Sequence, residues 1–553
     1  MCLSRGPSER PGPLNAPLIW WRERAETREG RDLKTRFEHF GWRNIVADPS
    51  RLGTYVDLFC GISATGSRNK TDRRFLRMAA AWMLALDPAS LAILINRYTS
   101  LRETLQVDLA EHLRPLIDAV LEQQLARGLD PVETPGQFLL RRDDPDLARR
   151  LAERFPSRAE RQPGVGGWRE AACPRWSWIP ARRMRIGYVC SDLTSHPVGL
   201  SLRSLPLRHD KSRFQIFLYD QTVVPDPVVA GPMHLGADHA RLCHDLSPAE
   251  LENRIRADGI DVLVDLSGAV IGSGDTVFSR PAAPVRVSMI GYPGSMGTRV
   301  ADYAIVDRDA VPGQYRSGYG ERLIIMPRSF LPLDETFEIG EIGVSRSEAG
   351  LPEDGFVMAA FNRMNKVTLE TVRMWIACLR ALPHAVLWIA TDDEATIASA
   401  GSLMQRAGLA TDRLVVSPRV SVLEHARRHT LADVSLDPLG YNGGYTTALS
   451  LRCGVPVVSR PGRCFAWRMS AGMLRAAGLD ACVVESAADY LKQVRRIAED
   501  PDHARSLREK LTANRLLEAL GTRRYVADLE RAFLAIADQE SRGAARRDIV
   551  ING

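Results

Sequence analysis

A glycine-rich turn followed by the start of a helix occupies residues 437–447, Asp-Pro-Leu-Gly-Tyr-Asn-Gly-Gly-Tyr-Thr-Thr. Gly443 and Gly444 permit backbone angles that a Cβ would forbid, and a short helix is expected over Ala448–Arg452. Such a turn directs backbone N–H groups and the positive end of the helix dipole at one point, which suits a phosphate or pyrophosphate. Because an ordinary strand-to-helix connection uses the same residues, this stretch alone leaves both interpretations open.

A histidine that could take part in chemistry follows an apolar strand expected over Met184–Cys190. His196 precedes Pro197, so it is expected in a loop at the carboxyl edge of that strand. Loops at this edge are where α/β folds commonly hold their reactive groups. A surface or capping histidine is the alternative that these residues leave open.

Two cations follow the strand expected over Gly355–Phe361. Arg363 offers a planar fork of donors and Lys366 a compact positive charge, and both suit a phosphate. We expect them to point into the same cleft as His196, from the opposite side. Two solvated loop cations are the alternative.

A short helix expected over Val422–His429 presents two more candidates. His425 could stack on a flat base, and Arg428 could bond the edge of that base or a phosphate. An amphipathic helix surface explains them as well. The turn Gly291–Gly297, which contains Pro293, can approach a ligand closely or serve only as a turn. Asp307-Arg-Asp309 matches a metal-binding pattern too common to assign a metal.

These candidates must be positioned by two runs of alternating strands and helices. Apolar strands that alternate with amphipathic helices predict parallel sheets covered on both faces, so the fold class is α/β with two consecutive doubly wound domains. Ligands bind at the carboxyl ends of the strands in such sheets. The expected divisions are a partly irregular extension (1–72), a helical domain (73–155), a linker (156–183), the two α/β domains (184–330 and 348–535) and a polar tail (536–553).

The overall composition restricts the class of protein more than its chemistry. The net charge of +6 over 553 residues is small, and without a basic and aromatic surface nucleic-acid binding is not expected. The nine cysteines include no C-x-x-C pair, so neither a zinc site nor a disulfide scaffold is indicated. No apolar run reaches the ~18–20 residues of a membrane span, and no signal peptide is recognisable, so a cytoplasmic protein is expected.

Several motifs in order along residues 184–535 resemble the catalytic region of the O-linked N-acetylglucosamine transferases, and more narrowly their bacterial branch. The most specific are Gly-Tyr-Pro-Gly at 291–294 and Tyr-Asn-Gly-Gly at 441–444. The others are Arg185–Asp192 followed by His196-Pro, Phe361-Asn with Lys366, Glu424-His425 with Arg428, and Gly454–Val458.

The resemblance implies a GT-B fold, in which two Rossmann-like domains face a cleft that holds a UDP-sugar and no metal. It implies inverting transfer of a sugar, N-acetylglucosamine, from UDP to Ser or Thr hydroxyls of a protein. Helical repeats commonly precede this region, which makes residues 73–155 a candidate degenerate tetratricopeptide-like domain. The implied catalytic residues are His196 and Lys366, and the implied UDP-sugar contacts are Arg363, Val420 (through its backbone), His425, Arg428, Gly443, Gly444, Tyr445, Thr446 and Pro293.

The sequence departs from the family pattern at several positions. Arg363 replaces an Asn or Gln, Tyr445 a small residue, Leu449 an Asp, and Asn253 an Asp of some members, and residues 269–274 lack a Tyr-Thr-x-Gly-x-Arg pattern. These departures leave two further hypotheses open. One is a non-catalytic UDP-binding scaffold on the same fold, and the other is a related enzyme with a different donor, such as UDP-glucose.

Overall fold

The computed structural model describes residues 88–155, 173–195, 197–268, 275–340 and 343–553. The chain divides into two compact units, residues 1–133 and 134–553. Helices α5 (Pro88–Glu103) and α6 (Val107–Ala126) belong to the first unit and lie within the predicted helical domain. They pack through a row of buried leucines such as Leu94, Leu101 and Leu113. The extension predicted over 1–72 lies outside the described residues.

The second unit begins with two helices that the sequence grouped with the preceding ones. These are α7 (Pro135–Arg141) and α8 (Pro145–Arg154). Between them, the Asp143 carboxylate accepts hydrogen bonds from the amides of Arg463 (2.7 Å) and Cys464 (2.5 Å). Arg149 of α8 donates to the carbonyl of Ser317 at 2.9 Å. Because these contacts tie α7 and α8 to residues far along the chain, the predicted helical domain 73–155 extends too far.

The first sheet of this unit has eight parallel strands in the order β13-β7-β6-β5-β4-β1-β2-β3. The order reverses between β1 and β4, so the loops after these two strands lie at the topological switch point. The strands are β1 (Met184–Cys190), β2 (Phe214–Asp220), β3 (His239–Leu242), β4 (Val262–Asp265), β5 (Val285–Ser288), β6 (Tyr303–Asp307), β7 (Arg322–Met326) and β13 (Ile549–Val550).

Helices cover both faces of the first sheet, as its nearly continuous apolar strands require. One face buries Ile186 and Val264 against α9 (Pro197–Leu202), α10 (Leu205–Arg208), α11 (Pro227–Gly236) and α22 (Thr522–Ser541). The other face buries Val189 and Leu263 against α12 (Pro248–Asp258) and α13 (Asp275–Phe278). The predicted α/β class is confirmed.

The second sheet has five parallel strands in the order β10-β9-β8-β11-β12. Its order reverses between β8 and β11, which makes the loops after these strands a second switch point. The strands are β8 (Phe356–Ala359), β9 (Ala385–Ala390), β10 (Leu414–Ser417), β11 (Val434–Leu436) and β12 (Val457–Val458). The helices of this domain are α14 (Leu369–Ala381), α15 (Glu394–Arg406), α16 (Val422–His429), α17 (Tyr445–Arg452), α18 (Met469–Ala476), α19 (Ala487–Glu499), α20 (Pro501–Lys510) and α21 (Ala513–Leu520).

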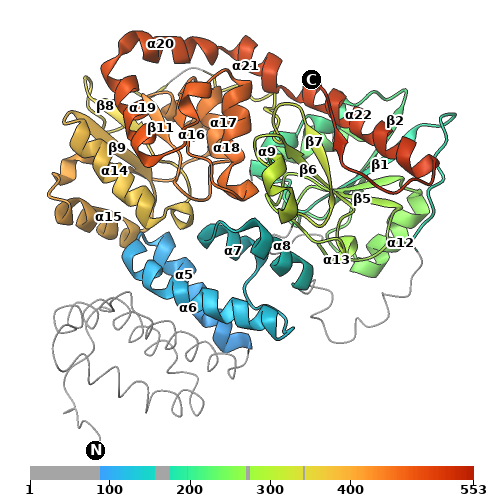
Figure 1. Ribbon diagram of the computed structural model, residues 1–553. Coiled ribbons are helices and arrows are strands. Elements are labelled where there is room, and N and C mark those ends of the chain that lie inside the picture. Colours follow the sequence, from blue (N-terminus) through green and yellow to red (C-terminus); the bar gives the residue numbers. More distant parts are fainter. Residues whose placement is uncertain (1–87, 156–172, 196, 269–274, 341–342) are drawn as a thin grey trace, which may run out of the picture. The chain divides into compact units, whose positions relative to one another are not determined.

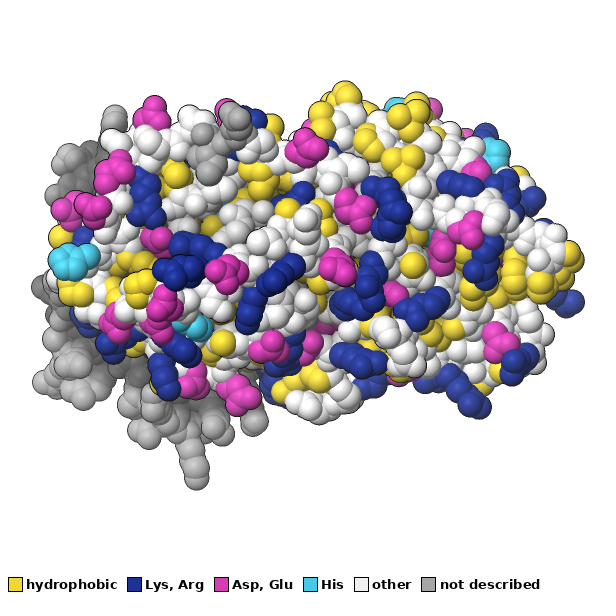
Figure 2. Space-filling view, turned by 90° about the horizontal axis from the view of Figure 1, so that it is seen from above, with side chains coloured by type: hydrophobic (Ala, Val, Ile, Leu, Met, Phe, Trp, Pro, Cys, Tyr) yellow, Lys and Arg dark blue, Asp and Glu magenta, His cyan; other side chains and the backbone are white. Residues whose placement is uncertain are grey.

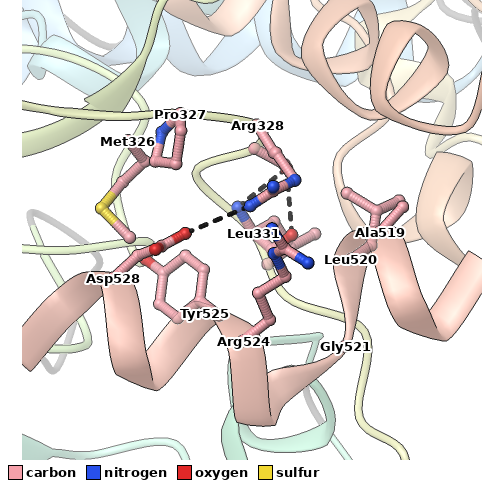
Figure 3. Close-up of a pocket in the computed structure, with 11 residues that line it drawn as sticks. Met326, Pro327, Arg328, Leu331, Ala519, Leu520, Gly521, Arg524, Tyr525 and Asp528 are labelled. Atoms are coloured by element: carbon pink, nitrogen blue, oxygen red, sulfur yellow. Dashed lines mark hydrogen bonds and ion pairs between the residues drawn. The ribbon is translucent and has the colours of Figure 1, made fainter. Parts of the chain in front are cut away.

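Helix α22 returns the chain from the second sheet to the first (Figure 1). Its Leu529, Phe533 and Ile536 are buried in the same core as strand β1. Where the chain crosses, residues 326–331 pack against 519–528 and leave a crevice of only about 10 Å³ (Figure 3). Arg328 reaches Asp528 across it at 3.5 Å. The crossover is therefore filled by the protein itself and is not a place for a nucleotide.

Charged side chains are mixed on the face of the molecule seen in Figure 2. Lys and Arg are interspersed there with Asp and Glu and do not form one continuous positive field. This distribution agrees with the small net charge of +6. Among the described residues, no helix combines the length and the apolar character needed to cross a membrane.

The polar tail predicted over 536–553 is wrong. Ile536 and Ala537 are buried in α22, and β13 adds a parallel strand to the edge of the first sheet, with Ile549 opposite Ile324 of β7. The Asp548 carboxylate accepts a hydrogen bond from the amide of Leu323 at 2.9 Å. Because β13 has only two residues and stands among Arg and Asp, its apolar pattern is too short to recognise in the sequence.

Replacing Ile549 by Ala should lower the melting temperature by several degrees, because loss of a buried isoleucine costs roughly 2–5 kcal/mol. Ile549 is 5% exposed, whereas the adjacent Val550 is 51% exposed. Val550→Ala is therefore the matched control and should leave the melting temperature nearly unchanged. Equal effects of the two substitutions in differential scanning calorimetry would contradict the docking of β13.

Candidate functional site

The second switch point brings Lys366 and the glycine turn together. Lys366 ends a short 3₁₀ turn after β8, η4 (Met364–Lys366), and the glycine turn follows β11. The Lys366 ammonium donates a hydrogen bond to the carbonyl oxygen of Asn442 at 2.9 Å. Its Nζ also lies 4.3 Å from the centre of the Tyr441 ring. A positive charge is thus held directly beside the turn that the sequence singled out.

Burial weakens the proton affinity of this lysine. Desolvation lowers the pKa of Lys366 to about 8, the nearby Asp437 carboxylate opposes that shift, and the positive charge of Arg363 adds to it. Arg363 itself is exposed at the N-terminal end of η4. A lysine that is partly desolvated gains most when an anion arrives, because the anion restores the stability of its charge.

A buried carboxylate that the sequence analysis did not assign to the site organises the turn. Asp437 is 1% exposed and accepts hydrogen bonds from the Gly443 amide (2.6 Å) and from the hydroxyls of Ser459 (2.5 Å) and Ser470 (2.7 Å). Burial raises the pKa of Asp437 to about 6 in spite of these bonds. An acidic residue directly after a central strand was the available signal, but the partners come from distant parts of the sequence.

The glycines of the turn are needed for a different reason from the one predicted. Neither Gly443 nor Gly444 is among the described glycines with positive φ. A Cβ on Gly443 would instead lie 2.4 Å from the Thr447 hydroxyl oxygen and 3.1 Å from an Asp437 carboxylate oxygen. Close approach of the backbone to these side chains, and not a left-handed conformation, therefore excludes any larger residue at 443.

Helix α17 starts at Tyr445, three residues before the predicted start at Ala448. Gly444 precedes it without a side-chain cap. Among the residues that the structure describes, no group is recorded as accepting a hydrogen bond from the amides of Tyr445–Thr447. These amides and the helix dipole converge on the turn beside Lys366, which is the arrangement that binds phosphate groups.

The start of α17 faces the first sheet. Tyr445 packs against the core that the first sheet shares with α9 and α22, and α17 contacts α9. Helix α9 follows the loop after β1, so the two switch points come together here. His196, which precedes α9, lies outside the described residues, as do residues 269–274.

Two departures from the family pattern lie in opposite environments, one buried and one exposed. Leu449 is 4% exposed and belongs to the buried side of α17. The next residue, Ser450, is a buried polar residue of α17, and its hydroxyl contacts the His429 ring at 3.1 Å and donates to the Ser435 hydroxyl at 3.2 Å. Asn253 is exposed on α12, and no contact of its side chain is recorded among the described residues.

A cluster of rings and cations lies beside the end of β8. Phe361 is 4.8 Å from the ring of His425, and the Arg428 guanidinium lies 5.6 Å from the Phe361 ring centre. Arg428 donates to Nδ1 of His425 at 3.2 Å and to the carbonyl of Pro418 at 2.6 Å. Burial, and then the charge of Arg428, lower the pKa of His425 to about 4, so its imidazole is neutral and can stack on a flat base.

Two predicted contacts remain, one in the loop before α16 and one in the first α/β domain. Val420 is 41% exposed in the loop between β10 and α16. Pro293 is buried and lines a crevice of about 20 Å³ together with α7, α8 and Arg463–Phe465. Its neighbour Tyr292 is buried, and burial first and then the nearby Tyr441 raise its pKa well above the usual value.

Comparison with known proteins identifies the family of the chain. Residues 170–339 and 334–529 match glycosyl transferase family 41. A probable UDP-N-acetylglucosamine–peptide N-acetylglucosaminyltransferase, SEC of Arabidopsis thaliana, is 29% identical over 359 residues, which are 64% of this chain and 37% of that protein. The UDP-N-acetylglucosamine–peptide N-acetylglucosaminyltransferase of Caenorhabditis elegans is 23% identical over 469 residues, 64% of this chain and 41% of that protein. The chain thus spans about two fifths of these curated relatives.

A solved structure matches over nearly the whole chain. The O-GlcNAc transferase of Thermobaculum terrenum, solved as a mutant, is 26% identical with a TM-score of 0.69, and the match covers 96% of this chain and 99% of the other. The predicted GT-B arrangement of two Rossmann-like domains is confirmed by this match. With the family match over both of its sheets, the chain belongs to glycosyl transferase family 41.

Proposed function

We propose that this protein transfers N-acetylglucosamine from UDP to Ser or Thr hydroxyls of a protein, with inversion at the anomeric carbon and without a metal ion. The observation that carries the proposal is the Lys366 ammonium, 2.9 Å from the Asn442 carbonyl, beside the N-terminus of α17. The relatives named for transfer from UDP-N-acetylglucosamine to peptide support the choice of donor and acceptor.

In this reaction the acceptor hydroxyl oxygen forms a bond to the anomeric carbon while the bond from that carbon to the β-phosphate oxygen breaks. The bonding electrons leave with UDP, and the hydroxyl proton goes to a base. Lys366, the amides at the start of α17 and the nearby Arg363 stabilise the charge that grows on the diphosphate. Gly443, Gly444, Tyr445 and Thr446 provide the backbone that approaches it.

The base and sugar contacts follow from the same arrangement. Neutral His425 stacks on uracil, Arg428 holds that imidazole in place, and the backbone of the exposed Val420 reaches the base edge. We assign the orientation of the acceptor, and relay of its proton, to His196 because it follows β1 at the first switch point. Pro293 is assigned to the sugar side through the turn it shares with Tyr292.

The cellular setting is part of the proposal. The cysteines of the described residues are free thiols, which persist in reducing compartments, and we therefore propose a cytoplasmic protein. Its partners are a UDP-sugar and a protein acceptor, and no nucleic acid. The match to the Thermobaculum protein over nearly all of both chains supports a place in the bacterial branch.

Lys366→Met should weaken UDP binding about 10- to 100-fold and abolish transfer, because a charge-assisted hydrogen bond to the diphosphate is worth roughly 1.5–3 kcal/mol. The matched control is Lys492→Met, which removes an exposed lysine on α19. Calorimetry with UDP and a transfer assay with UDP-N-acetylglucosamine, both with a chelator present, measure the two effects. Full transfer by Lys366→Met would contradict the proposed role of Lys366. UDP binding by the wild type without transfer or donor hydrolysis would identify a non-catalytic scaffold.

UDP affinity should fall as the pH rises above about 8. The pKa of Lys366 is lowered to about 8 without ligand, and a bound diphosphate raises it, so the complex takes up a proton. The affinity is therefore fully present below pH 8 and is lost above it, by up to about tenfold per pH unit. Titration in two buffers with different heats of ionisation measures this uptake near pH 8.5. Affinity that does not change from pH 7 to 9.5 would show that Lys366 does not meet the diphosphate.

Asp437→Asn should move this pH dependence to lower pH. The Asp437 charge is the group that opposes the lowered pKa of Lys366, so its removal lowers that pKa further. Asn keeps the shape of the side chain and can still accept from the Gly443 amide. The midpoint of UDP affinity against pH, compared with that of the wild type, reports the change. A midpoint that stays in place would mean that the two charges are not coupled.

A further inference from the structure

Three of the most exposed apolar side chains of the described residues lie close together in the first α/β domain. Val223 and Val224 are 75% and 76% exposed in the segment after β2, and Val228 is 62% exposed at the start of α11. We call these three residues the valine ridge. Apolar side chains that are exposed next to one another can form a surface that binds another molecule.

The valine ridge is held in a fixed conformation. Asp226, within it, caps α11 by accepting a hydrogen bond from the Val228 amide at 2.9 Å. At the other end, the Thr222 amide donates to the buried Asp220 carboxylate at 2.8 Å. Hydrogen bonds thus fix both ends of the turn that carries the three valines, which reduces the conformational entropy lost when a ligand covers them.

The same turn is bonded to the loop after β1. The Leu193 amide donates to the Thr222 hydroxyl oxygen at 2.9 Å, and the Asp226 amide donates to the Leu193 carbonyl at 2.8 Å. The Ser195 hydroxyl donates to the Asp226 carboxylate at 2.5 Å. Loop Ser191–Ser195 and the valine ridge are thus one continuous surface at the carboxyl edge of the first sheet.

This surface leads to the proposed phosphate site. Helix α9 follows the loop after β1, and it contacts α17, whose N-terminus lies beside Lys366. On α9, Gly199 has no room for a Cβ, which would lie 2.7 Å from a Val229 methyl group and 2.8 Å from the Asp192 carbonyl. Helix α9 is thus packed tightly against α11 and the loop after β1, and it also contacts α17, so it links the valine ridge to the helix beside Lys366.

We propose that the valine ridge binds apolar side chains of an extended acceptor polypeptide, next to the Ser or Thr that receives the sugar. This inference rests on the proposed function, because the acceptor must approach the donor from the side of the loop after β1. The segment Val223–Val228 contains no Lys or Arg, as an anionic membrane surface would require. Three side chains also provide far less area than the ~800 Å² per partner of a stable dimer. A short apolar stretch of an unfolded chain needs neither basic residues nor a large contact area, so it fits the valine ridge.

Two synthetic peptides test the proposal, each with one Ser, flanked either by Val and Pro or by Gly. Fluorescence anisotropy in the presence of UDP measures their affinity for the full chain and for the variant Val223→Ser/Val224→Ser/Val228→Ser. We expect the variant to lose about tenfold or more of its affinity for the apolar peptide and less than about twofold for the Gly peptide. In transfer assays the same loss should appear in KM, with kcat and donor hydrolysis unchanged.

The control variant is Ile397→Ser, which removes a 40% exposed side chain on α15 of the other domain. It should leave both peptide affinities unchanged. An equal loss for both peptides, or no loss for either, would overturn the proposal. So would a triple-valine variant that changes the oligomeric state of the protein in solution but neither peptide affinity. UDP binding and donor hydrolysis are read separately, so failure of the proposed transfer is distinguishable from failure of the valine ridge.

Discussion

The site depends on one partly buried positive charge that is held against a turn of the backbone. Lys366 donates to the Asn442 carbonyl, and Asp437, buried beneath the same turn, provides the opposing charge. Desolvation works against the lysine and the carboxylate alike, since it lowers the pKa of one and raises that of the other. In the absence of ligand each charge is therefore stabilised incompletely. A diphosphate beside Lys366 would relieve this cost where charge develops during the proposed transfer.

The arrangement of the two sheets brings the switch points of both close to this charge. Reversal of strand order in each sheet leaves a gap between neighbouring loops, and these loops carry the candidate residues. The contact of α17 with α9 joins the two gaps. Helix α22, which follows the second sheet in the sequence, buries Phe533 in the core of the first sheet. Asp143, which precedes both sheets, binds the amides of Arg463 and Cys464 in the second domain.

Much of the fold could be predicted because its signals are local. Alternation of apolar strands and capped helices indicated two parallel sheets, and the residues that follow β8 and β11 could be assigned to one site. The features that the sequence did not predict depend on partners distant in the sequence. Strand β13 pairs with β7 through two residues, and Asp437 is bonded by Ser459 and Ser470. The need for glycine at 443 was predicted from backbone angles, whereas the structure shows that the close approach of Thr447 requires it.

A crystal structure of the full chain with UDP tests the central claim most directly. The interaction described above predicts diphosphate oxygens within about 3 Å of Lys366 Nζ and of the amides at the start of α17, with the uracil ring against His425. A complex in which the diphosphate lies away from Lys366 and is bound by other cations would contradict it.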